Sequence, residues 1–208
     1  MTPRRLRRRK PTGEGVKLVE VLIAVAIVVG LCGLGGCAAS SPHPRVRRLR
    51  APIVAAARVE GASPRAEGAA FVERSLRDGG LRFGTDGSAR ALWHYLRATH
   101  DTVSAERARQ GDVVFFDTRA TDADPDCDDV TDHAGLVESV EPDGRIIFLE
   151  ARAGQVRRSV VDPAHPMLRR NERGEIANSF LRSKRVADPP NARYFAGQMF
   201  CGIARVVR

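Results

Sequence analysis

The sequence contains few of the residue types that form metal centres or nucleic-acid interfaces. Only four of its 208 residues are cysteine, five are histidine, and aromatic residues make up 5%. The cysteines and histidines have no zinc-finger spacing, and the basic residues are not interleaved with aromatic side chains. We therefore expect no nucleic-acid partner and predict no cofactor. A hydrophobic content of 43% is ordinary for one globular domain with a tail.

Positive charge is concentrated at the N-terminus. The formal net charge is +9, but residues 1–37 hold seven of the 34 basic and two of the 25 acidic residues. The remaining chain has 27 basic and 23 acidic residues, a net charge of +4. Most of the excess charge is thus interpreted as a targeting feature. A mildly positive remainder suits an anionic cell wall or lipid surface.

Residues 1–37 have the composition of an export leader. A basic stretch is followed by the uncharged apolar run Leu22–Leu34, which ends in Leu-Gly-Gly-Cys at Cys37. This ending resembles the lipobox of bacterial lipoproteins, and the resemblance implies lipidation of Cys37. Two alternatives remain open: an uncleaved apolar anchor, and prepilin-like processing, whose signature Gly15–Ile23 resembles. All three predict a membrane-anchored protein of the cell envelope, outside the cytoplasm.

Residues 38–51 are rich in Ser, Pro and Arg and are predicted to be a tether to a domain at 52–208. Hydrophobic periodicity and turn residues predict helices first and an antiparallel meander after them, an α+β class. The predicted helices are Pro52–Glu60, Ala66–Asp78, a third capped by Asp86 or Ser88, and Glu175–Arg185. The predicted strands are Val113–Phe116, His133–Val140, Ile146–Leu149 and Gln155–Asp162. The apolar segment Tyr194–Val207 is expected to pack back on the domain.

Two motifs carry a family resemblance. Gly-Asp-Val-Val-Phe-Phe at Gly111–Phe116 and His-Ala-Gly-Leu-Val at His133–Val137 resemble the NlpC-type and CHAP families of cell-wall cysteine peptidases and amidases. The resemblance covers roughly residues 52–160. It implies a papain-like fold, His133 as the base, and an orienting residue on the neighbouring strand near Glu150. It also implies peptidoglycan or its stem peptides as the partner.

The chain departs from these families at the nucleophile. Their cysteine begins the second helix, where the helix N-terminus lowers the pKa of the thiol, and the best register sets Gly68 at that position, with Glu67 in place of an aspartate. Cys127 lies among aspartates, which disfavour a thiolate, and Cys201 lies in an apolar run. Whether the two form a disulfide is left open. Two functions remain: a degenerate hydrolase that binds wall peptide or a partner, and an active endopeptidase or amidase that uses His133 with an unrecognised nucleophile.

The segment before His133 contains a second candidate site. Four alternating aspartates resemble calcium-loop carboxylates, but glycine and glutamate are missing at the two places where an EF-hand loop needs them. A solvated acidic loop and loose calcium binding both remain open, and we predict no dedicated metal site. The four candidates are Asp122, Asp124, Asp126 and Asp128.

Overall fold

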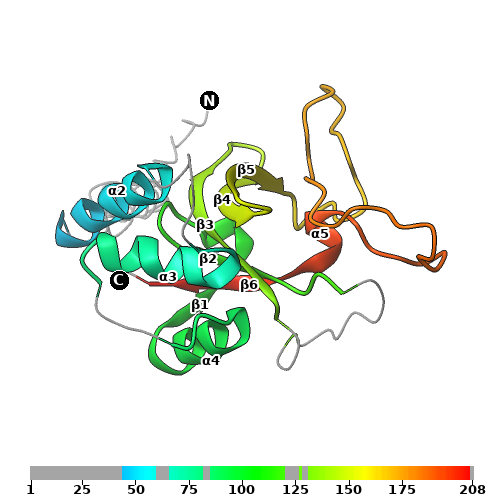
Figure 1. Cartoon of the computed structure of the whole chain (residues 1–208). Coiled ribbons are helices and arrows are strands. Elements are labelled where there is room, and N and C mark those ends of the chain that lie inside the picture. Colours follow the sequence, from blue (N-terminus) through cyan, green and yellow to red (C-terminus); the bar gives the residue numbers. More distant parts are fainter. Residues whose placement is uncertain (1–43, 60–65, 82–84, 120–126, 128–130, 207–208) are drawn as a thin grey trace, which may run out of the picture. The chain divides into compact units, whose positions relative to one another are not determined.

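The structure, a computed structural model, describes residues 44–59, 66–81, 85–119, 127 and 131–206. In the described residues, three helices precede all six strands of an antiparallel sheet, so the predicted α+β class is confirmed (Figure 1). The helices are α2 (Pro44–Val59), α3 (Gly68–Asp78), α4 (Ala89–Thr99), the short 3-10 helix η2 (Ala105–Arg107) and α5 (Ala196–Met199). The strands are β1 (Asp101–Val103), β2 (Val113–Phe116), β3 (His133–Val140), β4 (Ile146–Arg152), β5 (Gln155–Val161) and β6 (Phe200–Arg205).

The strand order is β1-β6-β2-β3-β4-β5, so β2 to β5 form a continuous meander. Strands β2 and β3 have the bounds expected from their β-branched and aromatic residues. Phe116 at the end of β2 pairs with His133 at the start of β3. The predicted turn between β3 and β4 contains Gly144, whose φ of +88° favours glycine. The meander therefore places His133 at one end of the sheet.

Successive side chains of each strand point to opposite faces of the sheet, so the core has two layers. Val113 and Phe115 pack with the helices α2, α3 and α4, whereas Val114 and Phe116 belong to the core on the opposite face. That opposite core includes Leu181 and other residues C-terminal to β5. The segment between β5 and β6 therefore covers the sheet face that the three large helices leave open.

Three details differ from the sequence-based expectations. Helix α2 begins at Pro44, so residues 44–51 are helical instead of part of a tether. An internal proline removes a helical hydrogen bond, which is why Pro52 was expected to be the start. Arg50 before Pro52 and Ile53 after it are both buried, so the helix is anchored on both sides of the proline. The predicted helix Glu175–Arg185 is wrong, because the segment forms turns and isolated bridges, and β1 was not predicted.

Candidate functional site

The candidate site lies where helix α3 begins beside the first residue of β3. Gly68 is the first helical residue of α3, and His133 is the first residue of β3. A Cβ atom added to Gly68 would lie 3.9 Å from Nδ1 of His133. The structure thus brings together the two residues that the sequence register had paired. A side chain at position 68 would point at the imidazole.

Glu150 holds the other nitrogen of the imidazole. Nε2 of His133 lies 2.5 Å from Oε2 of Glu150, and the imidazole also lies against the ring of Phe116. Both members of the pair are enclosed: His133 is 9% exposed and Glu150 is fully buried. Because Nε2 is hydrogen-bonded to Glu150, the imidazole is oriented with Nδ1 toward Gly68. This arrangement is that of a base and its orienting carboxylate.

The Glu150 carboxylate has further partners. Oε1 accepts a hydrogen bond of 2.5 Å from the Ser159 hydroxyl on β5 and lies 3.6 Å from a guanidinium nitrogen of Arg152. Burial by itself raises the pKa of Glu150, but the hydrogen bond and charge of His133, the Ser159 hydroxyl and Arg152 outweigh it. The pKa of Glu150 is therefore held below its ordinary value of 4.5. The group is a carboxylate at neutral pH.

A cavity of about 490 Å³ opens in front of His133. The N-termini of two eleven-residue helices, α3 and α4, reach its wall. Helix N-termini carry partial positive charge and free backbone N–H groups, so these walls favour anionic or carbonyl oxygens of a ligand. Its lining residues are Glu67, Gly68, Ala69, Gly87, Ser88, Ala89, Thr131, Asp132, His133, Ala151 and Arg152.

The backbone at Gly68 explains the residue found there. Its φ is +54°, in the left-handed region that L side chains rarely adopt. The carboxylate of the preceding residue, Glu67, accepts a hydrogen bond of 2.6 Å from the backbone N–H of Gly154 in the β4–β5 turn. A nucleophilic side chain at position 68 would therefore need a backbone conformation that L residues rarely adopt.

The described cysteines supply no substitute nucleophile, because Cys127 and Cys201 form a disulfide with Cα atoms 5.6 Å apart. This settles the pairing that the sequence left open. Two hydroxyls line the cavity, but both have structural partners. Ser88 accepts a hydrogen bond from the backbone N–H of Ala91 as the N-cap of α4, and Thr131 donates to the carbonyl of Cys127. The two hydroxyls thus belong to the cap of α4 and to the connection with Cys127.

Several predicted positions lie outside the described residues: Cys37 and the aspartates Asp122, Asp124, Asp126 and Asp128. In the part of the chain that the structure covers, no group of three or more His, Cys, Asp or Glu residues could hold a metal ion. Within the same part, no helix is both long and apolar enough to cross a membrane.

Sequence reasoning missed three contributors to the site. Ser159 bonds Glu150 from β5, Arg152 lies beside Glu150 two positions along β4, and the N-terminus of α4 at Ser88 forms part of the cavity wall. Glu150 and Arg152 are two residues apart, and this spacing predicts that their side chains lie on the same face of the strand. Ser159 gave no comparable signal, because its role depends on the register between β4 and β5.

Taken together, the fold and the site define an α+β protein in which a His–Glu pair faces the N-terminus of a helix across a cavity. Such an imidazole can donate or accept a proton, and covalent chemistry would need a nucleophile opposite it. Comparison with known proteins adds no family: no protein-family model and no curated protein sequence matches the chain.

Proposed function

We propose that this chain carries a papain-like domain of the NlpC and CHAP type that binds cell-wall peptide and has lost the hydrolytic reaction. The observation that carries the proposal is the geometry at Gly68. Its missing side chain would point at Nδ1 of His133 from 3.9 Å, at the start of a helix. A helix N-terminus beside an oriented imidazole is the environment that activates a thiol. Glycine in that position removes the nucleophile and leaves the cleft.

Binding without cleavage is consistent with the rest of the site. The cavity of about 490 Å³ has room for a short peptide segment and offers backbone N–H groups of two helices to its carbonyl or carboxylate oxygens. His133 adds a further donor or acceptor through Nδ1. An acid/base group alone contributes about 10²- to 10⁴-fold to a rate. Amide bonds are stable enough that such a factor does not make an efficient hydrolase.

The same proposal places the protein in the cell envelope, anchored by a lipid on Cys37 or by the apolar segment itself. The Cys127–Cys201 disulfide supports an oxidising compartment, because such bonds are rare in reducing cytosol. Metabolic labelling with a fatty-acid probe tests the lipid. We expect incorporation in the wild type and its loss in Cys37→Ala, and incorporation in neither would reject the lipoprotein hypothesis.

The binding function is tested with purified protein and soluble stem peptides. We expect the wild type to bind the peptides, to release no new muropeptides from peptidoglycan, and to lose at least tenfold in affinity in His133→Ala. His94→Ala is the matched control, because His94 is an exposed histidine of α4 that does not line the cavity. Absence of peptide binding by the wild type, or an equal loss in both variants, would reject the binding function.

The alternative is an active peptidoglycan endopeptidase or amidase with an unrecognised nucleophile. The intact hydrogen bond between His133 and Glu150 favours it, because a base with its orienting carboxylate is still present. Muropeptide release decides between the two functions. Release that persists in the double variant Cys127→Ala/Cys201→Ala and vanishes in His133→Ala would establish the enzyme and overturn our proposal.

A further inference from the structure

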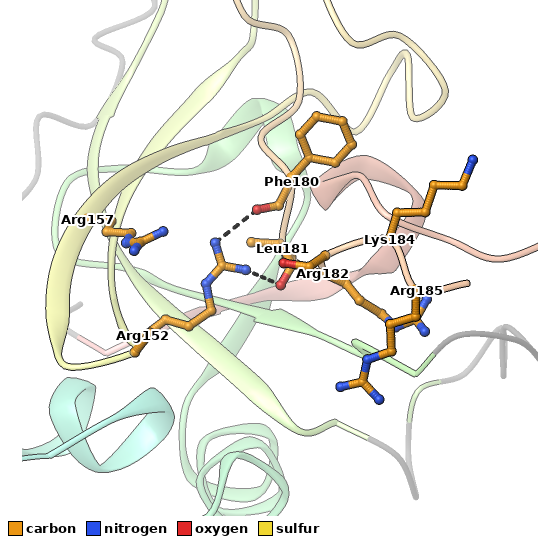
Figure 2. A pocket seen from close by; sticks show the side chains of 9 residues that line it. Arg152, Arg157, Phe180, Leu181, Arg182, Lys184 and Arg185 are labelled. Carbon is orange, nitrogen blue, oxygen red and sulfur yellow. Dashed lines mark hydrogen bonds between the residues drawn. The ribbon is translucent and has the colours of Figure 1, made fainter. Parts of the chain in front are cut away.

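A second, larger pocket lies between the β4–β5 hairpin and the segment that follows β5. It has a volume of about 750 Å³. Arg152, Ala153 and Arg157 come from the hairpin, and Phe180–Arg185 form the opposite wall (Figure 2). The second wall lies beyond residues 52–160, so the family resemblance does not cover it. We call this the basic pocket.

The lining of the basic pocket is strongly cationic. Five of its nine lining residues are arginine or lysine, and none is aspartate or glutamate. The five are Arg152, Arg157, Arg182, Lys184 and Arg185. Like charges gathered around one concave surface raise the local positive potential and attract anions from solution.

Two of these cations have structural roles. The guanidinium of Arg152 donates to the carbonyls of Phe180 and Leu181, which ties the hairpin to the opposite wall (Figure 2). Arg182 is held by the Asp188 carboxylate and lies over the ring of Tyr194. These two side chains fix the shape of the basic pocket, and each is paired with a carboxylate, Arg152 with Glu150 and Arg182 with Asp188.

The other three cations are uncompensated. Arg157, Lys184 and Arg185 are exposed, and none of them has an ion pair with any residue in the described ranges. Among the described residues, the side chains of these three cations make one hydrogen bond, from Arg157 to the amide oxygen of Gln155 at 3.4 Å. In Figure 2, Arg157 lies on one side of Arg152, and Lys184 and Arg185 lie on the other. Positive charge is therefore distributed along the opening instead of meeting at one point.

An aromatic platform for a nucleobase is not available at this opening. Phe180 is 49% exposed, but the guanidinium of Arg169 lies over its ring at 4.8 Å and Phe195 packs against it with ring centroids 5.0 Å apart. Single-stranded nucleic acids gain much of their affinity from bases stacked on free aromatic faces. Because the basic pocket offers cations but no open aromatic face, it favours an anion that has no nucleobases.

We propose that the basic pocket binds a linear anion carrying two or more phosphate groups. A guanidinium group donates paired hydrogen bonds to phosphate oxygens. Cations that are spaced along an opening match an anion with repeated charges better than they match a single carboxylate. Arg157 and Arg185 contact the phosphates in this proposal, while Arg152 and Arg182 hold the walls. The site is separate from peptide binding, although Arg152 also lines the cavity in front of His133.

The probe is sodium tripolyphosphate, titrated calorimetrically into the full chain kept in non-ionic detergent. We expect binding to the wild type that weakens as salt is raised, and a loss of about tenfold or more in the double variant Arg157→Gln/Arg185→Gln. Arg107→Gln is the matched control, because Arg107 is an exposed arginine of η2 outside the pocket. Circular dichroism verifies that all variants are folded. No binding by the wild type, or an equal loss in the control, overturns the proposal.

Two further measurements separate the sources of phosphate. Vesicles of phosphatidylglycerol are compared with neutral phosphatidylcholine vesicles, and a single-stranded oligonucleotide is compared with tripolyphosphate. A preference for anionic vesicles without tripolyphosphate binding, or oligonucleotide binding that is the tighter of the two, would replace this proposal with a membrane or nucleic-acid surface. If the wild type binds stem peptide but not tripolyphosphate, the basic-pocket site alone is rejected and the proposed function stands.

Discussion

Gly68 combines two properties that bear on the loss of catalysis. Its φ of +54° favours glycine over any L residue, and its Cβ direction points at His133. A side chain in the left-handed region costs about 1–2 kcal/mol. A cysteine substituted at position 68 would therefore have to adopt a strained backbone conformation. Once present, its thiolate would be stabilised by both the helix N-terminus and the imidazole.

We predict that Gly68→Cys produces a thiol whose pKa is below the ordinary 8.5 of cysteine. The measurement is the pH dependence of iodoacetamide labelling at position 68, followed by peptide mass spectrometry. Gly80→Cys is the control, because Gly80 also has a positive φ but has no atom within 4 Å of its added Cβ. Adding His133→Ala to Gly68→Cys should raise the thiol pKa. Equal labelling curves at positions 68 and 80 would mean that no activating environment survives.

Glu150 should give the stability of the protein a component that depends on pH. Its folded pKa is depressed, so the stabilisation is present above the ordinary value of 4.5 and is lost as pH falls through the folded pKa. We predict that Glu150→Gln lowers the free energy of unfolding by about 1–3 kcal/mol at pH 7. The difference from wild type should shrink as the pH falls from 4.5 through the lower folded pKa of Glu150.

Urea denaturation at a series of pH values measures this difference. Glu172→Gln is the control, because Glu172 is an exposed glutamate distant from His133 in sequence. Subtracting the two curves removes the contributions of carboxylates common to both proteins. A Glu150→Gln difference that stays constant with pH would show that the His133–Glu150 hydrogen bond does not depend on an ionised carboxylate.

Strand β3 carries its own packing requirement at Gly135, within the His-Ala-Gly motif. An added Cβ would lie 2.4 Å from Cδ2 of Phe148 on β4. Phe148 is fully buried, so the clash cannot be relieved by moving the ring into solvent. The glycine of the motif is thus explained by close packing between neighbouring strands and needs no catalytic role.

We predict that Gly135→Ala lowers the free energy of unfolding by about 1–3 kcal/mol through overpacking. Phe148→Leu should relieve the clash, so the double variant should be more stable than the sum of the two single effects. Thermal or urea unfolding of the four proteins measures this coupling. Purely additive effects would show that Gly135 is not in contact with Phe148.

The elements that sequence reasoning placed well are those with a strong local signal. Val113–Phe116 is β-branched and aromatic, and Ser88 is a helix cap, so both were predicted with little error. The segment from Glu175 to Arg185 has no such signal, because its backbone is held by bonds to distant partners such as Arg145. The pairing of Gly68 with His133 came from the family resemblance, since hydrophobic periodicity says nothing about which helix end meets which strand.

The basic pocket could not be predicted for a similar reason. Arg152 and Arg185 lie more than thirty residues apart, and only the path of the chain after β5 brings their segments together. That path crosses the sheet face occupied by Phe116 and Phe148, where Leu181 completes the core. The C-terminal extension therefore buries one face of the sheet and also forms one wall of the pocket.

The Cys127–Cys201 disulfide joins the segment before β3 to the last strand, across a separation of 74 residues. Constraining a loop of that length in the unfolded chain stabilises the folded state by about 4 kcal/mol in the chain-entropy model. The bridge also lies close in sequence to Thr131 and Asp132, which line the cavity in front of His133. Thr131 donates a hydrogen bond to the carbonyl of Cys127, so the bridge and the cavity wall are physically connected.

We predict that Cys127→Ser/Cys201→Ser lowers the free energy of unfolding by about 2–5 kcal/mol and weakens stem-peptide binding at a temperature where the variant is still folded. Urea denaturation and peptide titration are the measurements, and the wild type in excess reductant should reproduce both effects. A variant that matches the oxidised wild type in stability would mean that the two cysteines are not bridged. If stability falls but peptide affinity is unchanged, the bridge stabilises the fold without positioning Thr131 for peptide binding.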